Sequence, residues 1–354
     1  MVPKSPASPA DDSANTPVAS AIVLNYNGRD YVEEAVRSLL EQDLPGLEVL
    51  VVDNGSTDGS GDGIERSFAG RMRLLRAPCN LGFGAGNNLG IREARGRYLI
   101  LLNNDAVAEP SFAREMVAAA EADPRVGMVA ARVLDYARRS VLDTVGHLLY
   151  PDGLNRGRGR LEEDRGQYRD CRTALFPSGA AALYARRMLD DVGLFDETFF
   201  LYGDDAELGL RGRVAGWTCA LAPQAIAYHH YSRSSGPYSS LKAFYVERNR
   251  VLVLFRLFPV SLILVSPAYT AVRLALQAWG ALTGRGAAGR LAADSSILHL
   301  AAITLRAYAS ALRALLHIVP ERWRHRDRRR LRTSEFIGLL NEFRLTAREA
   351  AFKD

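Results

Sequence analysis

Short apolar runs alternate with helical patterns through the first third of the chain, and each run ends in polar residues. Residues 20–24 and 47–52 are apolar over a length typical of strands. Between them, Val32, Val36 and Leu39 fall on one face of a helix. The order strand, helix, strand predicts a βαβ unit, whose crossover we expect to be right-handed.

The same alternation continues beyond this first unit. It predicts strands over 72–75, 98–102, 126–131, 183–184 and 225–228, and helices over 64–68, 85–94, 111–121, 186–192 and from residue 204. Residues 138–172 are polar and rich in Gly and Arg with weak periodicity, so we expect a mobile loop there. Alternating strands and helices favour the α/β class, with a mostly parallel central sheet flanked by helices.

The pattern becomes helical and strongly apolar toward the C-terminus. Residues 257–272 carry no charge, but they are shorter than the roughly 20 residues of a bilayer span, and Pro259 and Pro267 interrupt them. Residues 297–318 repeat the apolar pattern, and a cluster of arginines follows. Its members are Arg322, Arg324, Arg326, Arg328, Arg329, Arg330 and Arg332. Amphipathic helices beside a polybasic segment predict peripheral or re-entrant attachment to an anionic membrane surface on its cytoplasmic face.

Composition and charge narrow the class of protein further. A length of 354 residues accommodates one large domain with a smaller appendage. The net charge of +5 lies mostly in the arginine cluster, and no aromatic platform accompanies it, so we expect no nucleic-acid partner. Three cysteines without CxxC spacing fit a reducing compartment. Residues 1–18 lack the apolar core of a secretory signal, and we expect a disordered tail.

Two of the predicted strands end in a carboxylate inside a polar turn. Asp53 follows the strand 47–52 in VVDNGSTDGS, and Asp105 follows the strand 98–102 in LLNNDA. In an open α/β sheet the ligand crevice lies beyond the carboxyl ends of the strands. Carboxylate and amide oxygens bind hard cations, and small polar turns approach a base or ribose closely. The two acids therefore predict a nucleotide site, with one loop at the nucleoside and the other at its phosphates.

Six motifs extend this prediction: AIVLNYNG, VVDNGSTDGS, NLGFGAGNNLGI, YLILLNNDA, GLFDETFFLYGDDAEL and AYHH. In this order and spacing they resemble the inverting family 2 glycosyltransferases, especially the bacterial rhamnosyltransferase-like branch. The resemblance covers residues 20–240 and implies the GT-A fold, which is Rossmann-like. We therefore expect a GT-A catalytic domain over residues 19–240 and a helical, apolar and basic membrane-associated region over residues 241–354.

The resemblance also implies a set of nucleotide-binding residues. It assigns Asp53 to the acid that accepts a hydrogen bond from the nucleobase. It assigns Asn104 and Asp105 to the DxD position, where Asn103 replaces the first acid. The remaining implied positions line the nucleotide pocket or the loop that closes over the diphosphate, and they are Asn25, Tyr26, Asn80, Gly82, Phe83, Gly86 and Asn87.

The catalytic chemistry is implied in the same way. Asp204 and Asp205 align with a Glu-Asp pair whose second acid is the general base, so we assign that role to Asp205. One base is enough for an inverting transfer, whereas a retaining hydrolase needs two opposed carboxylates. A divalent cation, Mg²⁺ or Mn²⁺, at Asp105 and His229 is expected to stabilise the leaving diphosphate. Arg211, beyond Asp205 on the same predicted helix, is placed to face the site.

Each of these residues also has a structural interpretation. Asp204 and Asp205 suit a helix cap, and Arg211 suits an ion pair. His229 suits the end of a strand. We interpret the aromatic residues of the stretch FFLY as core or loop packing rather than as acceptor contacts.

Together the predictions describe a membrane-associated hexosyltransferase of polysaccharide biosynthesis in a bacterial cell envelope. It would move L-rhamnose from dTDP-L-rhamnose, a donor named from the family branch alone, to a hydroxyl of a growing, lipid-linked glycan. The alternatives are the same reaction with UDP-galactofuranose or UDP-N-acetylhexosamine, or a catalytically silent nucleotide-sugar-binding subunit. Asp205 speaks against the silent subunit, whereas Asn103 in place of an acid leaves it open.

Overall fold

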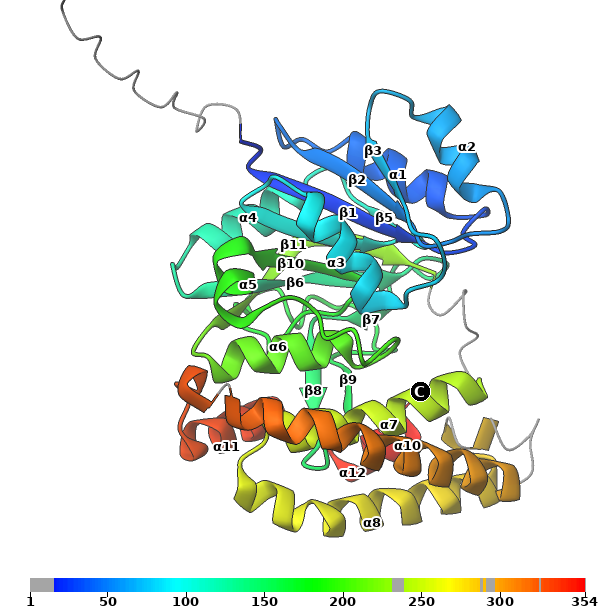
Figure 1. Cartoon of the computed structure of the whole chain (residues 1–354), viewed down its shortest axis with the longest axis vertical. Helices are drawn as coiled ribbons and strands as arrows, with labels where there is room; N and C mark the ends of the chain where they lie inside the picture. Colours follow the sequence, from blue (N-terminus) through cyan, green and yellow to red (C-terminus); the bar gives the residue numbers. More distant parts are fainter. Residues whose placement is uncertain (1–15, 231–238, 287–288, 291–296, 325, 354) are drawn as a thin grey trace, which may run out of the picture.

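The structure is a computed structural model that describes residues 16–230, 239–286, 289–290, 297–324 and 326–353. Most of the expected N-terminal tail lies outside the described residues. The residues up to His230 form an α/β layer, and the C-terminal helices form a second layer beneath it (Figure 1).

A nine-stranded sheet forms the centre of the α/β layer. Strands β3, β2, β1 and β4 are parallel, β10 runs antiparallel to β4 and β6, and β11 is parallel to β6. The short strands β5 and β7 pair with β11 and β6. The strands are β1 (Ala19–Asn25), β2 (Glu48–Asp53), β3 (Arg73–Arg76), β4 (Tyr98–Asn103), β5 (Ala106–Ala108), β6 (Val126–Asp135), β7 (Leu142–Thr144), β10 (Ala181–Ala185) and β11 (Thr218–His229). The mostly parallel sheet confirms the predicted fold class.

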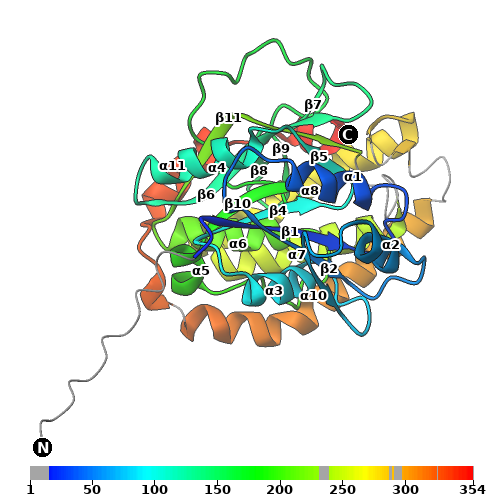
Figure 2. The same cartoon turned by 90° about the horizontal axis from the view of Figure 1, so that it is seen from above.

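Helices cover both faces of this sheet. Figure 2 shows α1 and α4 on one face, and α3, α5 and α6 on the other. The helices of this layer are α1 (Val32–Leu40), α2 (Ser60–Ser67), α3 (Phe83–Glu93), α4 (Phe112–Glu121), α5 (Arg186–Val192) and α6 (Asp204–Val214). Every residue of β2 is therefore buried, and β4 is buried up to its last residue. Burial on both faces explains why these strands are continuous apolar runs in the sequence.

The strand register brings the polar strand ends to one edge of the sheet. Asn25 lies opposite Asp53 in the pair β1 and β2, and β4 ends beside them at Asn103. His229 ends β11 and pairs with the first residue of β5, directly after Asp105. Side chains that are far apart in the sequence thus meet where a ligand binds in open α/β sheets.

The structure corrects the prediction of an irregular loop over residues 138–172. This segment contains β7 and a hairpin of β8 (His147–Leu149) and β9 (Asn155–Gly157). Asp143, Asp152 and Arg160 within it are buried. Strands of three residues are too short to show a period of two, and buried charges remove the hydrophobic signal on which the prediction relied.

The C-terminal helices pack against one another and against the α/β layer. They are α7 (Ser240–Leu257), α8 (Val260–Thr283), α10 (Ile297–Arg324), η2 (Arg326–Arg328), α11 (Thr333–Glu342) and α12 (Ala347–Phe352). Helix α10 runs along α7, and α12 packs on α8. By length and composition, two helices in the described part of the chain could cross a membrane, α8 and most of α10. Pro267 lies inside α8, although the sequence predicts an interruption there.

A buried cluster of charges joins α8 to the rest of the molecule. Arg273 of α8 is fully buried, and its Nε donates to Asp152 Oδ2 at 2.7 Å while its Nη1 donates to Glu247 Oε1 at 2.6 Å. Arg250 Nε donates to the second oxygen of Glu247 at 2.8 Å. Asp152 belongs to the β8–β9 hairpin, whereas Glu247 and Arg250 belong to α7. Since a buried charge is tolerated only when it is paired, this cluster fixes α8 against both layers.

Replacing Arg273 tests this interpretation. The variant Arg273→Ala leaves two buried carboxylates with one cation fewer, so we expect the free energy of unfolding to fall by about 3 kcal/mol. Urea denaturation in mild detergent, followed by circular dichroism, measures the change. The matched control Arg71→Ala removes an exposed arginine and should change stability by less than about 0.5 kcal/mol. Equal losses in the two variants would show that the cluster does not hold the layers together.

Candidate active site

Asparagines from neighbouring strand ends form a hydrogen-bonded floor at the carboxyl edge of the sheet. Asn25 Nδ2 donates to Ser60 Oγ at 2.8 Å and to Ser56 Oγ at 3.2 Å. Asn104 Nδ2 donates to Asn25 Oδ1 at 3.1 Å. A Cβ on Gly28 would lie 2.3 Å from Asn104 Nδ2, so the turn after β1 approaches this floor as closely as it does only because it carries glycine. The structure thus brings the predicted residues Asn25 and Asn104 together.

Asp53 lies at the same edge and is nearly buried. Its Oδ1 accepts from the main-chain N–H of Ser56 at 3.2 Å, and its Oδ2 lies 3.4 Å from Arg76 Nη1. A Cβ on Gly61 would lie 2.2 Å from the same Oδ2, which shows how closely the start of α2 approaches the carboxylate. Tyr26, on the turn after β1, is 38% exposed and so remains accessible to a ligand.

The predicted loop over the diphosphate is held by amide side chains. Asn80 Oδ1 accepts from Asn54 Nδ2 at 3.1 Å and from the N–H of Gly82 at 2.9 Å. Gly82 has a φ of 85°, and a Cβ there would lie 2.3 Å from the carbonyl oxygen of Phe200. That same oxygen accepts from the N–H of Phe83 at 2.6 Å. The loop is therefore tied to the segment that precedes α6.

Two other residues implied for this loop occupy structural positions inside α3. A Cβ on Gly86 would lie 2.5 Å from a methyl carbon of Leu24, so this glycine allows α3 to pack closely on β1. Asn87 Nδ2 donates to the carbonyl oxygen of Phe83 at 3.0 Å within the same helix.

A chain of charged groups surrounds His229. Its Nε2 lies 3.2 Å from Asp105 Oδ1, and its Nδ1 lies 2.8 Å from Asp143 Oδ2. The other oxygen of Asp143 pairs with Arg160 Nη1. Burial lowers the pKa of His229, but the two carboxylates outweigh burial and raise the pKa to about 10. Burial raises the pKa of Asp105 and Asp143, but His229 outweighs it and holds both below their usual range.

The donor set of Asp105 and His229 fits a divalent cation that is bound together with a diphosphate. Asp143 holds Nδ1 of His229, so Nε2 is the nitrogen that faces Asp105, as in many metal sites where a carboxylate orients the histidine. Because the raised pKa keeps a proton on this ring at neutral pH, a bound cation would have to displace the proton from Nε2. Within the described residues there is no group of three or more His, Cys, Asp or Glu suited to a metal. Since Mg²⁺ is commonly held by one or two carboxylates and substrate phosphates, the phosphates would supply the remaining ligands.

The acidic pair at the start of α6 contains two different environments. Asp205 Oδ2 accepts from the N–H of Gly179 at 3.0 Å, and Oδ1 accepts from the N–H of Ala206 at 2.8 Å. Asp204 is buried, and its Oδ1 has no hydrogen-bond partner among the described residues. Burial and the neighbouring Asp205 charge raise the pKa of Asp204 to about 8. Asp204 is therefore mostly neutral at pH 7, which makes it a poor proton acceptor at that pH.

His147 of β8 lies close enough to Asp205 and Asp143 for the charges of both to act on it. It stacks on Phe176 with ring centres 4.9 Å apart and is buried deeply enough that its pKa is lowered. The charges of Asp205 and Asp143 both act on it in the opposite direction. Burial outweighs these two charges, so the neutral form of His147 is favoured.

Arg211 occupies a structural position. Its Nε donates to Glu207 Oε1 at 2.9 Å, and its Nη2 donates to the carbonyl oxygen of Leu194 at 2.6 Å. Its Nη1 donates to the carbonyl oxygens of Val192 and Gly193. These contacts favour the ion-pair interpretation of Arg211 over a contact with the ligand.

The sequence did not identify Asp143, Arg160 or His147 as site residues. All three lie in the segment that we expected to be an irregular loop. The alternation LDTVGHLL around Asp143 and His147 carries a weak strand signal, which the surrounding glycines and arginines obscure. The available signs in the sequence were a histidine and an acid within this weak strand pattern.

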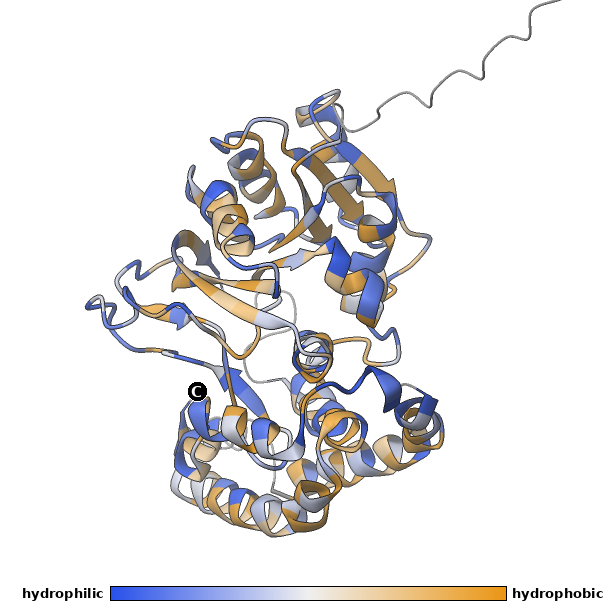
Figure 3. Ribbon diagram, turned by 90° about the vertical axis from the view of Figure 1, so that its left-hand side faces the viewer, coloured by the Kyte–Doolittle hydropathy of each residue, from blue (hydrophilic) through white to orange (hydrophobic). Residues whose placement is uncertain are grey.

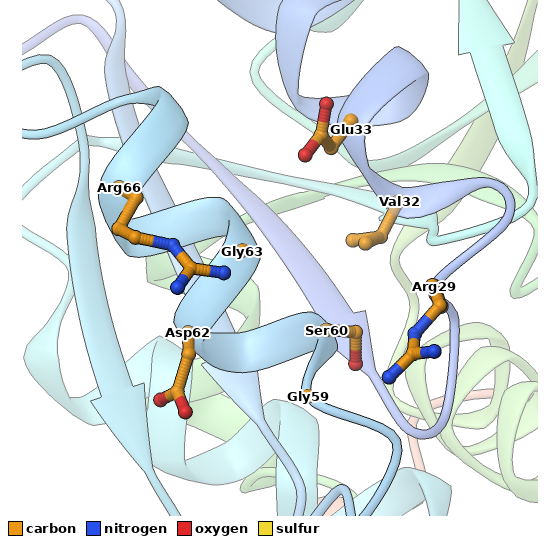
Figure 4. Close-up of a pocket in the computed structure, with 8 residues that line it drawn as sticks. All are labelled: Arg29, Val32, Glu33, Gly59, Ser60, Asp62, Gly63 and Arg66. Carbon is orange, nitrogen blue, oxygen red and sulfur yellow. The ribbon is translucent and has the colours of Figure 1, made fainter.

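A pocket of about 340 Å³ lies next to this edge of the sheet, between the starts of α1 and α2 (Figure 4). Arg29, Glu33, Asp62 and Arg66 line it together with Ser60, which also accepts from Asn25. The pocket therefore adjoins the asparagine floor without containing the acids of the site.

Comparisons with known sequences support the motif analysis. Residues 20–193 match the family model described as Glycosyl transferase family 2. The chain is 28% identical over 258 residues to the N-acetylglucosaminyl-diphospho-decaprenol L-rhamnosyltransferase of Mycobacterium tuberculosis, covering 64% of this chain and 81% of that protein. It is 32% identical over 231 residues to the O-antigen biosynthesis protein RfbC of Myxococcus xanthus, covering 62% of this chain but 18% of that protein. It is also 31% identical over 246 residues to the uncharacterized protein y4gI of Sinorhizobium fredii and spans 25% of its length.

Comparisons with solved structures support the fold. The mannosyltransferase PcManGT of Pyrobaculum calidifontis, solved with GDP-Man and Mn²⁺, superposes with a TM-score of 0.52 at 20% identity, covering 87% of this chain and 91% of that chain. GalNAc-T7, solved with UDP, GalNAc and Mn²⁺, superposes with a TM-score of 0.55 at 15% identity, covering 68% of this chain and 48% of that chain. At such low identities the likeness shows the GT-A fold alone.

The raised pKa of Asp204 predicts how stability depends on pH. The carboxyl is protonated in the folded chain up to about pH 8 but ionised in the unfolded chain above about pH 4. The folded state therefore binds more protons in this window, and Asp204 makes stability fall as pH rises through it. Because Asn cannot ionise, the variant Asp204→Asn should not lose this stability as pH rises. The difference between its melting temperature and that of the parent should therefore grow from pH 5 to pH 8 and then level off.

Differential scanning fluorimetry across this pH range measures the effect. The control Asp170→Asn changes an exposed acid and should give a difference that stays constant with pH. A constant difference for Asp204→Asn as well would contradict a protonated Asp204 at neutral pH.

Proposed function

Because this chain belongs to glycosyl transferase family 2, we propose that it transfers a hexose from a nucleotide sugar to a hydroxyl of a lipid-linked, cell-surface glycan, with inversion at the anomeric carbon. The observation that carries this proposal is that Asn25, Asp53 and Asp105 follow strand ends at one edge of the sheet, where Asp205 is linked to the end of β4. The link runs through neighbouring residues, because Asp205 accepts from the N–H of Gly179 while the carbonyl oxygen of Ala180 accepts from the N–H of Asn103 at 3.0 Å. A single base with a separate diphosphate site is the arrangement that an inverting transfer requires.

Different strand ends would bind different parts of the nucleotide-sugar donor. Asp53 and the asparagine floor lie at the β1 and β2 ends, where the nucleoside is expected. Asp105 and His229 would hold a divalent cation on the diphosphate, and such a cation supplies stabilisation of the charge that develops on the leaving group. The loop at Asn80 and Gly82 would close over this part of the donor.

The transfer step itself would depend on Asp205. The acceptor hydroxyl oxygen forms a bond to the anomeric carbon from the face opposite the diphosphate, while the bond between that carbon and the diphosphate oxygen breaks. The hydroxyl proton passes to the Asp205 carboxylate, and the nucleoside diphosphate leaves with the bonding electrons. The hydrogen bonds from Gly179 and Ala206 orient the carboxylate for this step.

L-Rhamnose is the sugar that the named relatives support, and dTDP is the carrier that the resemblance to the rhamnosyltransferase-like branch implies. The relative from M. tuberculosis is named for transfer of L-rhamnose to a lipid diphosphate. A second relative is named for O-antigen biosynthesis, which is also a cell-surface glycan. UDP-galactofuranose and UDP-N-acetylhexosamine are the alternative donors, because the family shares one reaction among several sugars.

Membrane association is supported by an apolar outer surface on the helical layer. Most of the exposed large hydrophobic side chains of the described residues lie on α8 and α10, and hydrophobic stretches along these helices are visible in Figure 3. The apolar outer surface comprises Val260, Leu264, Val265, Val272, Trp279 and Leu282 of α8, and Leu298, Leu305, Leu312, Leu316 and Trp323 of α10. Exposed arginines lie at the end of α10 and directly after it, among them Arg324, Arg326 and Arg328. This combination suits helices that lie on the anionic, cytoplasmic face of a membrane.

A panel of nucleotide sugars tests the proposed donor. Calorimetric titration of the full chain with dTDP-L-rhamnose, UDP-galactofuranose, UDP-N-acetylglucosamine and GDP-mannose, each with Mn²⁺ and with EDTA, should give binding for one donor that EDTA weakens at least about tenfold. Equal affinity with and without EDTA would count against the cation at Asp105, and release of nucleoside diphosphate separates an enzyme from a silent binder. Binding of none of the donors would refute the proposal.

The variant Asp205→Asn tests the assignment of the base. It keeps the shape of the side chain but cannot take a proton, so turnover should fall at least about a hundredfold while the donor dissociation constant changes by less than about twofold. The matched variant Asp204→Asn replaces a mostly neutral carboxyl with an amide and should lose less than about tenfold. Unchanged turnover in Asp205→Asn, measured as release of nucleoside diphosphate, would eliminate Asp205 as the base.

Binding to vesicles tests the apolar outer surface. The triple variant of Leu305, Leu312 and Leu316 to Ser removes exposed side chains without touching the core, and should weaken binding to phosphatidylglycerol vesicles at least about a hundredfold. The control Leu161→Ser, an exposed leucine of the α/β layer, should bind as the parent does. Undiminished binding of the triple variant in sedimentation assays would show that α10 does not contact lipid.

A further inference from the structure

The segment that precedes the proposed catalytic base, Asp205, has an unusual backbone. Phe200 has a φ of 62°, Tyr202 has a φ of 63° and Gly203 has a φ of 81°. Side chains other than glycine rarely adopt this left-handed region, and such residues persist only where the surrounding structure holds them. The next residues are Asp204 and Asp205, so the position of the base depends on whatever holds this segment.

One buried side chain from the helical layer binds this segment. Asn249 of α7 is fully buried, and its Nδ2 donates to the carbonyl oxygens of Phe199 at 2.9 Å, Leu201 at 3.0 Å and Tyr202 at 2.6 Å. A Cβ on Gly203 would lie 3.3 Å from the Cβ of Asn249. The amide thus shares its two N–H bonds among three carbonyls of the left-handed stretch and packs against its last residue.

Neighbouring residues of α7 fix the orientation of this amide. Arg248 Nη1 lies 2.5 Å from Asn249 Oδ1 and also donates to the carbonyl oxygen of Thr198 at 3.1 Å. This contact identifies the oxygen of the side-chain amide, because an arginine can only donate. Arg256, two turns further along α7, pairs with Asp196 at the beginning of the same segment.

The held segment contacts both halves of the proposed site. On one side the carbonyl oxygen of Phe200 accepts from the N–H of Phe83 at 2.6 Å, in the loop over the diphosphate. On the other side the segment runs directly into the first turn of α6. There the carboxylate of Asp205 accepts hydrogen bonds from the N–H groups of Gly179 and Ala206. The segment therefore contacts the loop over the diphosphate at one end and the helix that carries the base at the other.

We propose that Asn249 is a positioning residue for the transfer reaction, and that α7 is consequently an integral part of the active site. The proposal rests on the proposed function for its chemistry, and on the three hydrogen bonds of Asn249 for its structure. It assigns the helical layer a second role besides membrane attachment, because a chain that ends before α7 would lose the group that holds the segment at residues 199–203.

Variants of Asn249 test the proposal in the full-length chain. Asn249→Ala removes the side-chain amide that donates these hydrogen bonds. Turnover should fall at least about twentyfold, because the base moves relative to the acceptor. The donor dissociation constant should change by less than about fivefold, and the calorimetric stoichiometry should stay that of the parent. Asn249→Ser retains one hydroxyl donor and should recover part of the lost turnover, which keeps the test usable if the alanine variant folds poorly.

A matched control separates positioning from loss of folded protein. Leu252→Ala removes a fully buried side chain from the same helix without changing a hydrogen bond of the segment. It should lower the melting temperature, whereas turnover per folded chain should remain within about twofold of the parent. A merely structural role of Asn249 would lower turnover and binding stoichiometry in proportion, as misfolding does. That result, or turnover of Asn249→Ala within about threefold of the parent, would overturn the proposal.

Hydrogen exchange distinguishes failure of this proposal from failure of the proposed function. In Asn249→Ala, amide exchange should accelerate in peptides that cover residues 196–207 and stay unchanged in the central strands. If the parent chain turns over no nucleotide sugar, the proposed function fails, and exchange in residues 196–207 alone decides whether Asn249 holds the segment. Unchanged exchange there would overturn the structural basis of the proposal whatever the activity.

Discussion

The burial of several carboxylates at one edge of the sheet is the constraint on which the rest of the site depends. A carboxylate that loses water must gain a cation, hydrogen-bond donors or a proton. Asp105 gains His229, and Asp205 gains main-chain N–H groups. Asp204 instead retains a proton, with a pKa of about 8. Asp105 and Asp204 therefore have opposite protonation states at neutral pH, although both are buried at this edge of the sheet.

The parts of this arrangement that depend on local pattern were predictable from the sequence. Apolar runs and the turns that follow them located the strand ends at Asn25, Asp53 and Asp105, and the βαβ order predicted the mostly parallel sheet. Asn249 was not predictable, because its hydrogen-bond partners lie more than 45 residues away in the sequence. His147 was not predictable, because ring stacking leaves no periodic signal. The strands of the β7–β9 segment escaped detection because each has three residues, too few to show a period of two, and because the segment buries charged side chains such as Asp143.

In the proposed function, the helical layer would link membrane attachment to the reaction chemistry. Helix α8 is long and apolar enough for a bilayer, yet Arg273 ties it to the β8–β9 hairpin and to α7. The same hairpin begins at His147, close to the acids of the site, and α7 carries Asn249. Helices that lie on a membrane while fixed in this way would keep the site at a constant position relative to the lipid surface, where a lipid-linked acceptor is presented.

The most direct measurement of the central claim is an experimental structure of the full chain with a non-hydrolysable nucleotide sugar and Mn²⁺. The account predicts the nucleoside between Asn25 and Asp53, the diphosphate beside Asp105 and His229, and the anomeric carbon facing Asp205. A nucleotide bound elsewhere, for example in the pocket lined by arginines between α1 and α2, with Asp205 remote from the sugar, would contradict it.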